Sequence, residues 1–197
     1  MFKKLKFLML LALFGLVVNV NGQAWEDWSG PVSGKTYNRN TTVNLTGDVT
    51  LNGKIIINGV TLTIQLPNSQ APSRTISRGS ANSCFFEIRN GGRLVIKGQS
   101  DTKTITLDGG AKWRRATTSD DAIYGYIQDC FDGGSPSGVS YPGVRNAVFD
   151  SSNGKSSDMA LIYSANSSFS LKYVVLENNY ATDKKGGAIR CCGKRKA

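Results

Sequence analysis

Apolar and polar residues alternate along this chain in short runs, and one spacing recurs. In each copy an apolar residue is followed six and eight positions later by two more, with a turn in the gap. The copies are Ile56, Leu62 and Ile64 around Asn58-Gly59; Ile88, Leu94 and Ile96 around Asn90-Gly91; Tyr163, Phe169 and Leu171 around Asn166; and, more loosely, Val43, Val49 and Leu51. This repeat predicts a stack of short strands in which the same apolar positions of every copy point inward.

The chain after residue 22 shows almost no helical periodicity. Short runs rich in Val, Ile, Leu and Thr alternate instead with turn residues such as Gly, Asn and Asp. The predicted strands cover residues 42–45, 49–51, 54–57, 60–66, 84–88, 93–97, 104–107, 147–150, 159–163, 169–171 and 173–176. The predicted fold class is therefore all-β.

Strands of this length can build a sandwich, a hairpin barrel or a parallel β-helix. Asn-Gly pairs between strands favour hairpins and hence antiparallel pairing. The constant phase of the copies favours a parallel β-helix, a solenoid whose equivalent residues stack as internal ladders. The copies lie 32 and then 75 residues apart, and we interpret the longer interval as about three coils. We therefore predict β-helix coils over residues 41–189, with an irregular loop excursion at about 111–141.

The two ends of the chain differ from this pattern. Residues 1–22 combine three early lysines with an apolar run from Phe7 to Val18, which predicts a signal peptide cleaved after Gly22. A membrane anchor is the alternative, but a span needs about 20 apolar residues and this run is shorter. We assign residues 23–40 to an N-terminal cap segment. Residues 190–197 form either a genuine basic tail or the product of truncation or a frameshift, and we expect a truncated stack.

The basic charge does not indicate a nucleic-acid partner. The net charge is +10, but the predicted signal peptide carries three lysines and no acid, which leaves +7. The tail carries four further cations and no acid, which leaves +3 for the rest of the chain. Because phosphate binding needs clustered basic side chains, we exclude nucleic acid. Without a histidine to complete a cluster with Cys84, Cys130, Cys191 and Cys192, we predict no metal site and no cofactor. Buried or unpaired thiols are favoured over a disulfide framework.

One segment near the end of the chain resembles a known repeat. Leu176-Glu177-Asn178-Asn179-Tyr180-Ala181, followed by Gly186-Gly187-Ala188-Ile189, resembles the paired motifs of the polymorphic outer membrane protein repeats, with Leu176 in place of their phenylalanine. The chain from residue 40 onward resembles secreted right-handed β-helix proteins of the pectate-lyase-like superfamily, of the type common in Bacteroidota. These resemblances imply a right-handed β-helix that is exported and associated with the cell surface.

The motif residues themselves have structural roles. Gly186-Gly187 permits a sharp bend with positive φ. Asn179 can stack on asparagines of neighbouring coils and bond the backbone of a turn. Neither role points to catalysis or to ligand binding.

Proteins of the pectate-lyase-like superfamily also include polysaccharide lyases and glycoside hydrolases, so we searched the chain for their chemistry. Under that alternative the weak catalytic candidates are Arg114, Asp120, Asp121, Asp129 and Asp132, as a base and carboxylates in the excursion. The galacturonan hydrolases of this superfamily use a glycine-histidine-glycine motif, and this chain has no histidine. Nothing in their spacing demands such a site, and solvated loop charges are the favoured explanation of the same residues.

Aromatic residues give the remaining candidates for binding. Trp113, Arg114 and Arg115 open the excursion and form a candidate binding surface. Trp25 and Trp28 could stack on sugars, but we interpret them as covering the open N-terminal end of the stack.

We expect an extracellular or cell-surface protein, with outer-membrane association as one form of it and no transmembrane span after signal removal. We expect it to act as an adhesin-like scaffold that binds polysaccharide, host-surface glycan or protein. The alternative is a polysaccharide lyase or glycoside hydrolase, and the sequence leans against an enzyme.

Overall fold

The computed structural model describes residues 23–80, 83–115, 147–182 and 187–193. These residues form strands and no helix, as the all-β prediction requires. The strands are β1 (Ala24–Val32), β2 (Lys35–Tyr37), β3 (Thr41–Leu51), β4 (Ile55–Asn58), β5 (Thr61–Gln65), β6 (Arg74–Arg78), β7 (Phe86–Arg89), β8 (Arg93–Lys97), β9 (Ile105–Asp108), β10 (Trp113–Arg115), β11 (Ala147–Phe149), β12 (Ile162–Ala165), β13 (Ser168–Lys172), β14 (Val174–Glu177) and β15 (Ile189–Cys192). The predicted signal peptide lies outside the described residues, within which no helix is long and apolar enough to cross a membrane.

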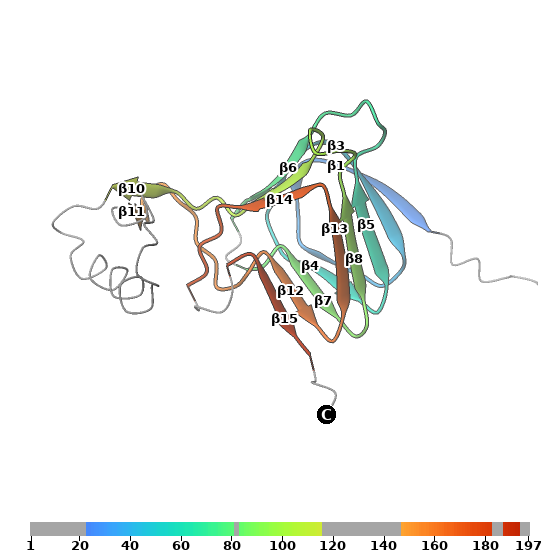
Figure 1. Cartoon of the computed structure of the whole chain (residues 1–197). Coiled ribbons are helices and arrows are strands. Elements are labelled where there is room, and N and C mark those ends of the chain that lie inside the picture. Colours follow the sequence, from blue (N-terminus) through green and yellow to red (C-terminus); the bar gives the residue numbers. More distant parts are fainter. Residues whose placement is uncertain (1–22, 81–82, 116–146, 183–186, 194–197) are drawn as a thin grey trace, which may run out of the picture.

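Parallel pairing dominates the body of the molecule. One sheet has the order β15-β12-β7-β4-β2, and the other runs β13-β8-β5-β3-β6-β9-β14, with β1 beside β3. The long strand β3 turns a corner, because its first residues pair with β5 and its last residues pair with β6. The strands thus surround a common interior in a nearly closed arrangement, which is compatible with a parallel β-helix (Figure 1).

The register confirms the two intervals of the repeat but corrects what lies between them. Leu62 pairs with Leu94 and Leu94 pairs with Phe169, at separations of 32 and 75 residues. The interpretation of 75 residues as about three coils is wrong, because β8 pairs directly with β13. Between these two strands the chain forms β9, β10, β11 and β12, and residues 116–146 lie outside the described residues.

The structure also corrects the phase of the first residue in each copy. Ile56 is only partly buried and faces outward, whereas Ile57 is fully buried and pairs with Ile88. In the third copy the inward residue is Ser164 rather than Tyr163. The cause is a β4–β5 connection one residue shorter than the β7–β8 connection, and a one-residue shift moves a side chain to the other face of a strand.

The loose fourth copy belongs to two different ladders. Val43 is buried opposite Ile64. Val49 is buried opposite Ile76, on the other side of the corner in β3. Its spacing therefore matches the other copies by coincidence. Its gap is the corner within β3, whereas the gap of each other copy is a turn that contains asparagine.

The core is closed in the first coils and open in the last. Leu62, Ile64, Leu94 and Ile96 have no exposed surface. Their counterparts in the last strands are only partly buried, as are the neighbouring apolar side chains Val174, Leu176 and Ile189. Burying one such aliphatic side chain contributes about 1.5–3 kcal/mol, so the central ladders supply most of the stability.

Asparagines stack along one corner of the body. Asn58 Nδ2 donates to Asn38 Oδ1 at 3.3 Å, and Asn90 Nδ2 donates to Asn58 Oδ1 at 2.6 Å. Asn90 and Asn166 adopt positive φ, of 55° and 48°, which asparagine tolerates better than most residues. The Asn-Gly pairs therefore turn the chain between parallel strands of different sheets, and no hairpin forms at them.

Asn179 does not join this ladder. Its Oδ1 accepts a hydrogen bond from Arg78 Nη2 at 2.9 Å, and its Nδ2 donates to the carbonyl groups of Met159 and Gly187. The expected bonding to turn backbone is confirmed, but the side-chain partner of Asn179 is an arginine that donates a hydrogen bond to it, in place of a stacked asparagine. Gly187 lacks the expected positive φ, and Gly186 lies outside the described residues.

Arg78 is a buried polar residue that the sequence pattern did not predict. Its side chain is 2% exposed, and its guanidinium donates to the carbonyl groups of Gly109 at 2.9 Å and Ser83 at 2.6 Å. It also lies 4.9 Å from the centroid of the Phe85 ring. Together with its bond to Asn179, these contacts link β6 to the residue that follows β9 and to the segment that follows β14.

The predicted cap segment forms regular strands. Residues 24–32 are β1 and pair in parallel with β3, and residues 35–37 are β2 and pair with β4. Trp28 is buried at this end of the core, as the cap interpretation requires. Trp25 is 62% exposed on the opposite face of β1, so the cap interpretation is wrong for that residue.

β10 and β11 lie outside the two parallel sheets, and we call this pair of strands the arm. β10 and β11 form an antiparallel pair, and residues 116–146 between them lie outside the described residues. The arm stands apart from the stacked strands (Figure 1). Phe149 stacks on Tyr180 with 4.4 Å between ring centroids.

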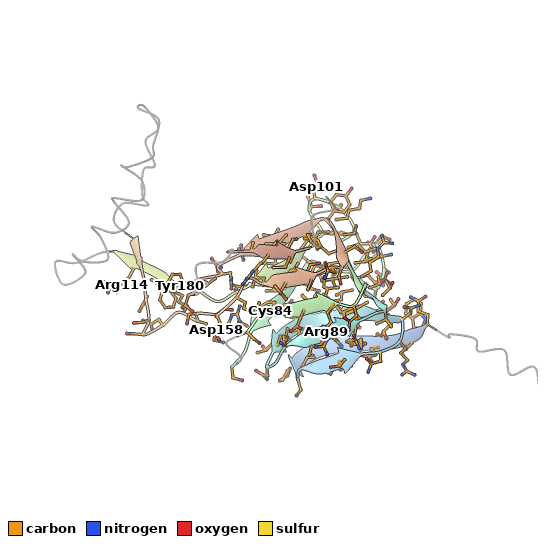
Figure 2. All side chains as sticks on the ribbon, turned by 90° about the horizontal axis from the view of Figure 1, so that it is seen from below. Cys84, Arg89, Asp101, Arg114, Asp158 and Tyr180 are labelled. Carbon is orange, nitrogen blue, oxygen red and sulfur yellow. The ribbon has the colours of Figure 1, made fainter. Side chains whose placement is uncertain are left out.

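Cys84 lies inside the body, whereas Arg114 and Tyr180 lie on the arm and at its base (Figure 2). Cys84 is buried, in agreement with the favoured interpretation, and burial raises the pKa of its thiol to about 11. Cys130 lies outside the described residues.

Candidate functional site

The predicted loop residues divide between the described and undescribed parts of the chain. Trp113, Arg114 and Arg115 form β10, and the Arg114 side chain is exposed on the arm (Figure 2). The predicted carboxylates at Asp120, Asp121, Asp129 and Asp132 lie outside the described residues. The predicted constellation of base and carboxylates is therefore untested.

The carboxylate that the structure does place near Arg114 is Asp150. Its oxygens accept hydrogen bonds from Asn153 Nδ2 at 2.9 Å and from the Ser152 amide at 3.0 Å. The hydrogen bond from Asn153 lowers the pKa of Asp150, and the charge of Arg114 contributes less. Asp150 thus holds the turn after β11.

The outer face of the β2–β4–β7–β12–β15 sheet carries mutually paired charges. Glu87 forms an ion pair with Lys54 and a longer one, at 3.7 Å, with Arg89. The Arg190 guanidinium lies 5.6 Å from the centre of the Tyr163 ring. Because these groups satisfy one another, this face offers little unpaired chemistry to a ligand.

The outer face of the β6–β9–β14 flank is hydroxyl-rich and weakly acidic. Ser77, Asp108 and Glu177 are neighbours in register. Asp108 Oδ1 accepts hydrogen bonds from the Gly110 amide at 2.9 Å and from Asn178 Nδ2 at 3.1 Å. Within the described ranges no group of three or more His, Cys, Asp or Glu side chains could hold a metal ion.

The remaining flank, outside β1, β3, β5, β8 and β13, combines an exposed aromatic ring with rows of polar side chains. We call it the Trp25 face. Its first row is Trp25, Thr42, Thr63, Val95 and Ser170, and its second row is Asp27, Asn44, Gln65, Lys97 and Lys172. The side chains of each row succeed one another at the strand spacing of about 4.8 Å.

Hydrogen bonds order the second row. Asn44 Nδ2 donates to Asp27 Oδ1 at 3.3 Å, and Gln65 Nε2 donates to Asn44 Oδ1 at 3.1 Å. Each amide thereby has a defined orientation, with its remaining donors and acceptors directed outward or along the row. Thr42 is covered, because it is 2% exposed and accepts a hydrogen bond from Gln23.

Among the residues whose exposure the structure gives, Trp25 is the most exposed large apolar one, at 62%. It stands at one edge of the face, and the exposed cations Lys97 and Lys172 lie on strands further along it. An exposed indole beside ordered amides and hydroxyls can stack on a sugar ring while the polar groups bond its hydroxyls. From the sequence, Trp25 was considered as a residue that could stack on sugars, but it was interpreted as part of the N-terminal cap.

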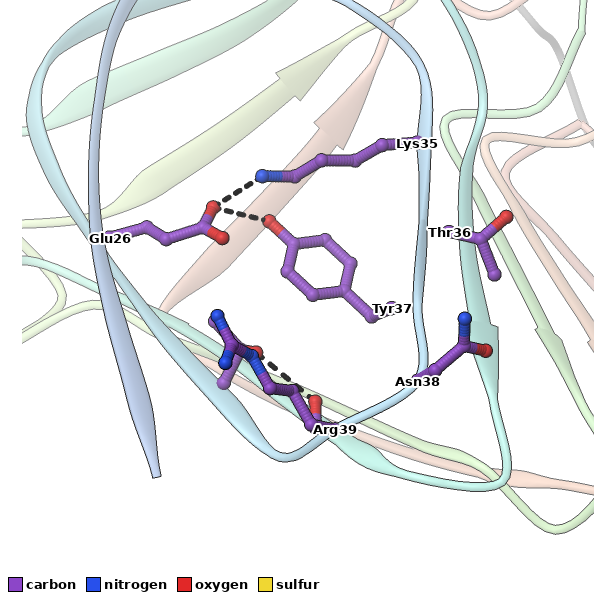
Figure 3. A pocket seen from close by; sticks show the side chains of 7 residues that line it. Glu26, Lys35, Thr36, Tyr37, Asn38 and Arg39 are labelled. Atoms are coloured by element: carbon purple, nitrogen blue, oxygen red, sulfur yellow. Dashed lines mark hydrogen bonds and ion pairs between the residues drawn. The ribbon is translucent and has the colours of Figure 1, made fainter. Parts of the chain in front are cut away.

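A separate hollow of about 320 Å³ lies at the N-terminal end of the body and is open to solvent. Its lining comes from β1, β2 and the start of β3: Glu26, Lys35, Thr36, Tyr37, Asn38, Arg39 and Thr41. Figure 3 shows Glu26 from one side meeting Lys35 and Tyr37 from the other.

One carboxylate oxygen organises this hollow. Glu26 Oε2 accepts hydrogen bonds from Lys35 Nζ at 2.5 Å, Tyr37 Oη at 2.7 Å and Trp28 Nε1 at 3.4 Å. Partial burial works to raise the pKa of Glu26, but the donors and the Lys35 charge outweigh it, and the pKa lies below its usual value. Burial, followed by the bond to Glu26, raises the pKa of Tyr37.

No motif or spacing in the sequence pointed to this cluster. Glu26 and Lys35 are ordinary polar residues of a segment assigned to a cap, and only the parallel course of β1 and the bend into β2 bring them together. A strand of alternating pattern around Trp28 would have been the one usable hint, since Glu26 lies two positions before it on the same face.

No family model matches the chain, and neither a curated protein nor a solved structure is significantly similar to it. The functional interpretation therefore depends on the geometry of these surfaces.

Proposed function

We propose that this protein is an exported right-handed parallel β-helix that binds carbohydrate through its Trp25 face, as an adhesin-like scaffold at a cell surface or in the extracellular medium. Export follows from the predicted signal peptide. The observation that carries the binding proposal is the exposed Trp25 ring at the edge of an ordered polar face.

The proposal of a β-helix is supported by the order in which strands return. The strands from β2 to β9 visit the three flanks in turn, and after the arm β12, β13 and β14 visit them again. Each return is parallel. Parallel connections are right-handed in almost all proteins, which supports the handedness.

The proposal of a carbohydrate ligand is supported by the chemistry of the Trp25 face. Leaving an indole exposed in water sacrifices apolar burial, which a ligand with an apolar ring face would recover. The amides of Asn44 and Gln65 lie on the same face, on the first and second strands beyond β1, and hydrogen bonds fix their orientations, as recognition of directional hydroxyl groups requires. Sugars present both an apolar ring face and directional hydroxyls.

The first test is a glycan array probed with the mature protein, followed by calorimetric titration of each glycan that binds. Replacing Trp25 by alanine should lower the affinity at least about tenfold, the size expected of an aromatic anchor at the centre of binding. The matched control is Tyr163→Ala, which removes an outward aromatic side chain from another sheet and should leave affinity unchanged.

Binding retained by Trp25→Ala, or lost equally in both variants, would count against the Trp25 face. We do not advance the enzymatic alternative, because the aspartates that it uses lie outside the described residues.

A further inference from the structure

The hollow at the N-terminal end of the body is a second candidate binding site, and it is distinct from the Trp25 face. Trp25 and Glu26 are adjacent in β1, so their side chains lie on opposite faces of that strand. We infer that the hollow binds a small hydroxycarboxylate, whose carboxylate group is held by Arg39. This inference does not depend on glycan binding by the Trp25 face.

The charges of the hollow leave one cation uncompensated. Lys35 is paired with Glu26 at 2.5 Å. Arg39 lines the same hollow, and among the described residues it forms no ion pair. Figure 3 shows the Arg39 side chain extending from the loop after β2 toward the side occupied by Glu26. A guanidinium group presents parallel N–H donors that match a carboxylate in geometry and charge.

The other groups of the hollow select for hydroxyls beside that carboxylate. All three donors to Glu26 bond Oε2, so Oε1 can accept a hydrogen bond from a ligand hydroxyl. Carboxylate and hydroxyl contacts therefore lie on different walls, as a hydroxycarboxylate would require.

The size of the hollow limits the ligand. A volume of about 320 Å³ is at the lower end of the range for small-molecule sites. The open end of the body admits a small molecule without any movement of the strands. The ring of Tyr37 gives the hollow one apolar wall, and Lys35 Nζ lies 4.7 Å from its centroid.

Calorimetric titration of the mature protein with sodium gluconate tests the inference. Sorbitol has the same carbon chain without the carboxylate and should bind at least about tenfold more weakly, because a charged hydrogen-bond pair is lost. Arg39→Gln should lower gluconate affinity by a similar factor.

Arg93→Gln is the matched control, since it removes one exposed cation from β8 and should leave gluconate affinity unchanged. Arg39 is exposed, so melting temperatures should confirm that its variant folds. Three results would overturn the inference: no gluconate binding at millimolar concentration, an equal loss in Arg39→Gln and Arg93→Gln, or inorganic phosphate binding as tightly as gluconate. The last result would identify a general anion site instead.

Discussion

The stacked body and the arm are built by different rules, although one continuous chain forms both. In the body each inward side chain rests on its counterpart in the next strand, and Leu94 between Leu62 and Phe169 has no exposed surface. The arm consists of a two-stranded antiparallel ribbon, with the Phe149–Tyr180 stack near its base. A two-stranded ribbon alone is marginally stable in water, so the comparison separates the part that folds by burial from the part that depends on a few contacts.

Arg78 joins the two regions. Its guanidinium reaches Gly109 before the arm and Asn179 after it, while Lys155 Nζ donates to the Arg78 carbonyl at 2.5 Å. Buried polar groups of this kind must be fully bonded to avoid a large desolvation cost. The junction thus replaces apolar ladders with hydrogen bonds where the regular coil is interrupted.

The largest expected effect breaks the body. Leu94→Asp or Ile96→Asp places an unpaired charge in the central ladder, which costs several kcal/mol and should unfold the protein. Val95→Asp changes the neighbouring residue in the same strand, but its side chain faces outward and the variant should fold. Thermal melting followed by circular dichroism distinguishes them; a Leu94→Asp variant that melts like the parent protein would disprove the ladder.

An intermediate effect tests the phase of the ladder. Ile57→Ala creates a cavity in the core and should cost about 2–5 kcal/mol. Ile56→Ala removes the same atoms from the outward-facing neighbour and should cost clearly less, because that site is only partly buried. Urea denaturation of both variants gives the two free energies of unfolding. Equal losses of unfolding free energy would show that Ile56 is also a core residue and would contradict the assignment of Ile57 as the inward residue.

The smallest expected effect concerns the arm. Phe149→Ala removes the ring stack with Tyr180. An aromatic pair of this kind contributes about 0.5–1.5 kcal/mol beyond the burial of its area. The global melting temperature should change little, whereas amide exchange at β10 and β11 should accelerate, because the body does not depend on this contact. Hydrogen exchange followed by mass spectrometry measures both regions in one sample. Equal acceleration in β5 and β8 would show that arm and body unfold together.

Much of the body was predictable from the sequence because burial leaves a pattern in it. The predicted strand at 93–97 agrees with β8, and 60–66 contains β5. The strands β1, β2, β6, β10 and β15 were missed. β2 has only three residues, and β6 is a polar run with one apolar residue, Ile76, at its centre, so neither shows enough alternation to stand out.

The candidate surfaces were much less predictable. Trp25 could be named as an aromatic of interest, but its exposure depends on which face of β1 meets the core. Glu26, Lys35 and Arg39 gave no signal at all, because none belongs to a motif and their convergence depends on the bend between β1 and β2. Trp113, Arg114 and Arg115 form β10, which pairs only with β11 and lies outside the two parallel sheets. The rest of the predicted excursion, from residue 116 on, lies outside the described residues and stays a prediction.

The sequence by itself determined that this protein is built of short strands, that Leu62, Ile64, Leu94 and Ile96 are core residues, and that asparagine turns separate them. Alternation and turn chemistry are local properties, so they can be read from neighbouring residues. Only the tertiary structure decided that β8 lies directly beside β13, that Ile57 rather than Ile56 faces inward, and that Glu26, Lys35 and Tyr37 share a hollow. Register and convergence depend on the lengths of connections and the direction of pairing, which act between residues far apart in the chain.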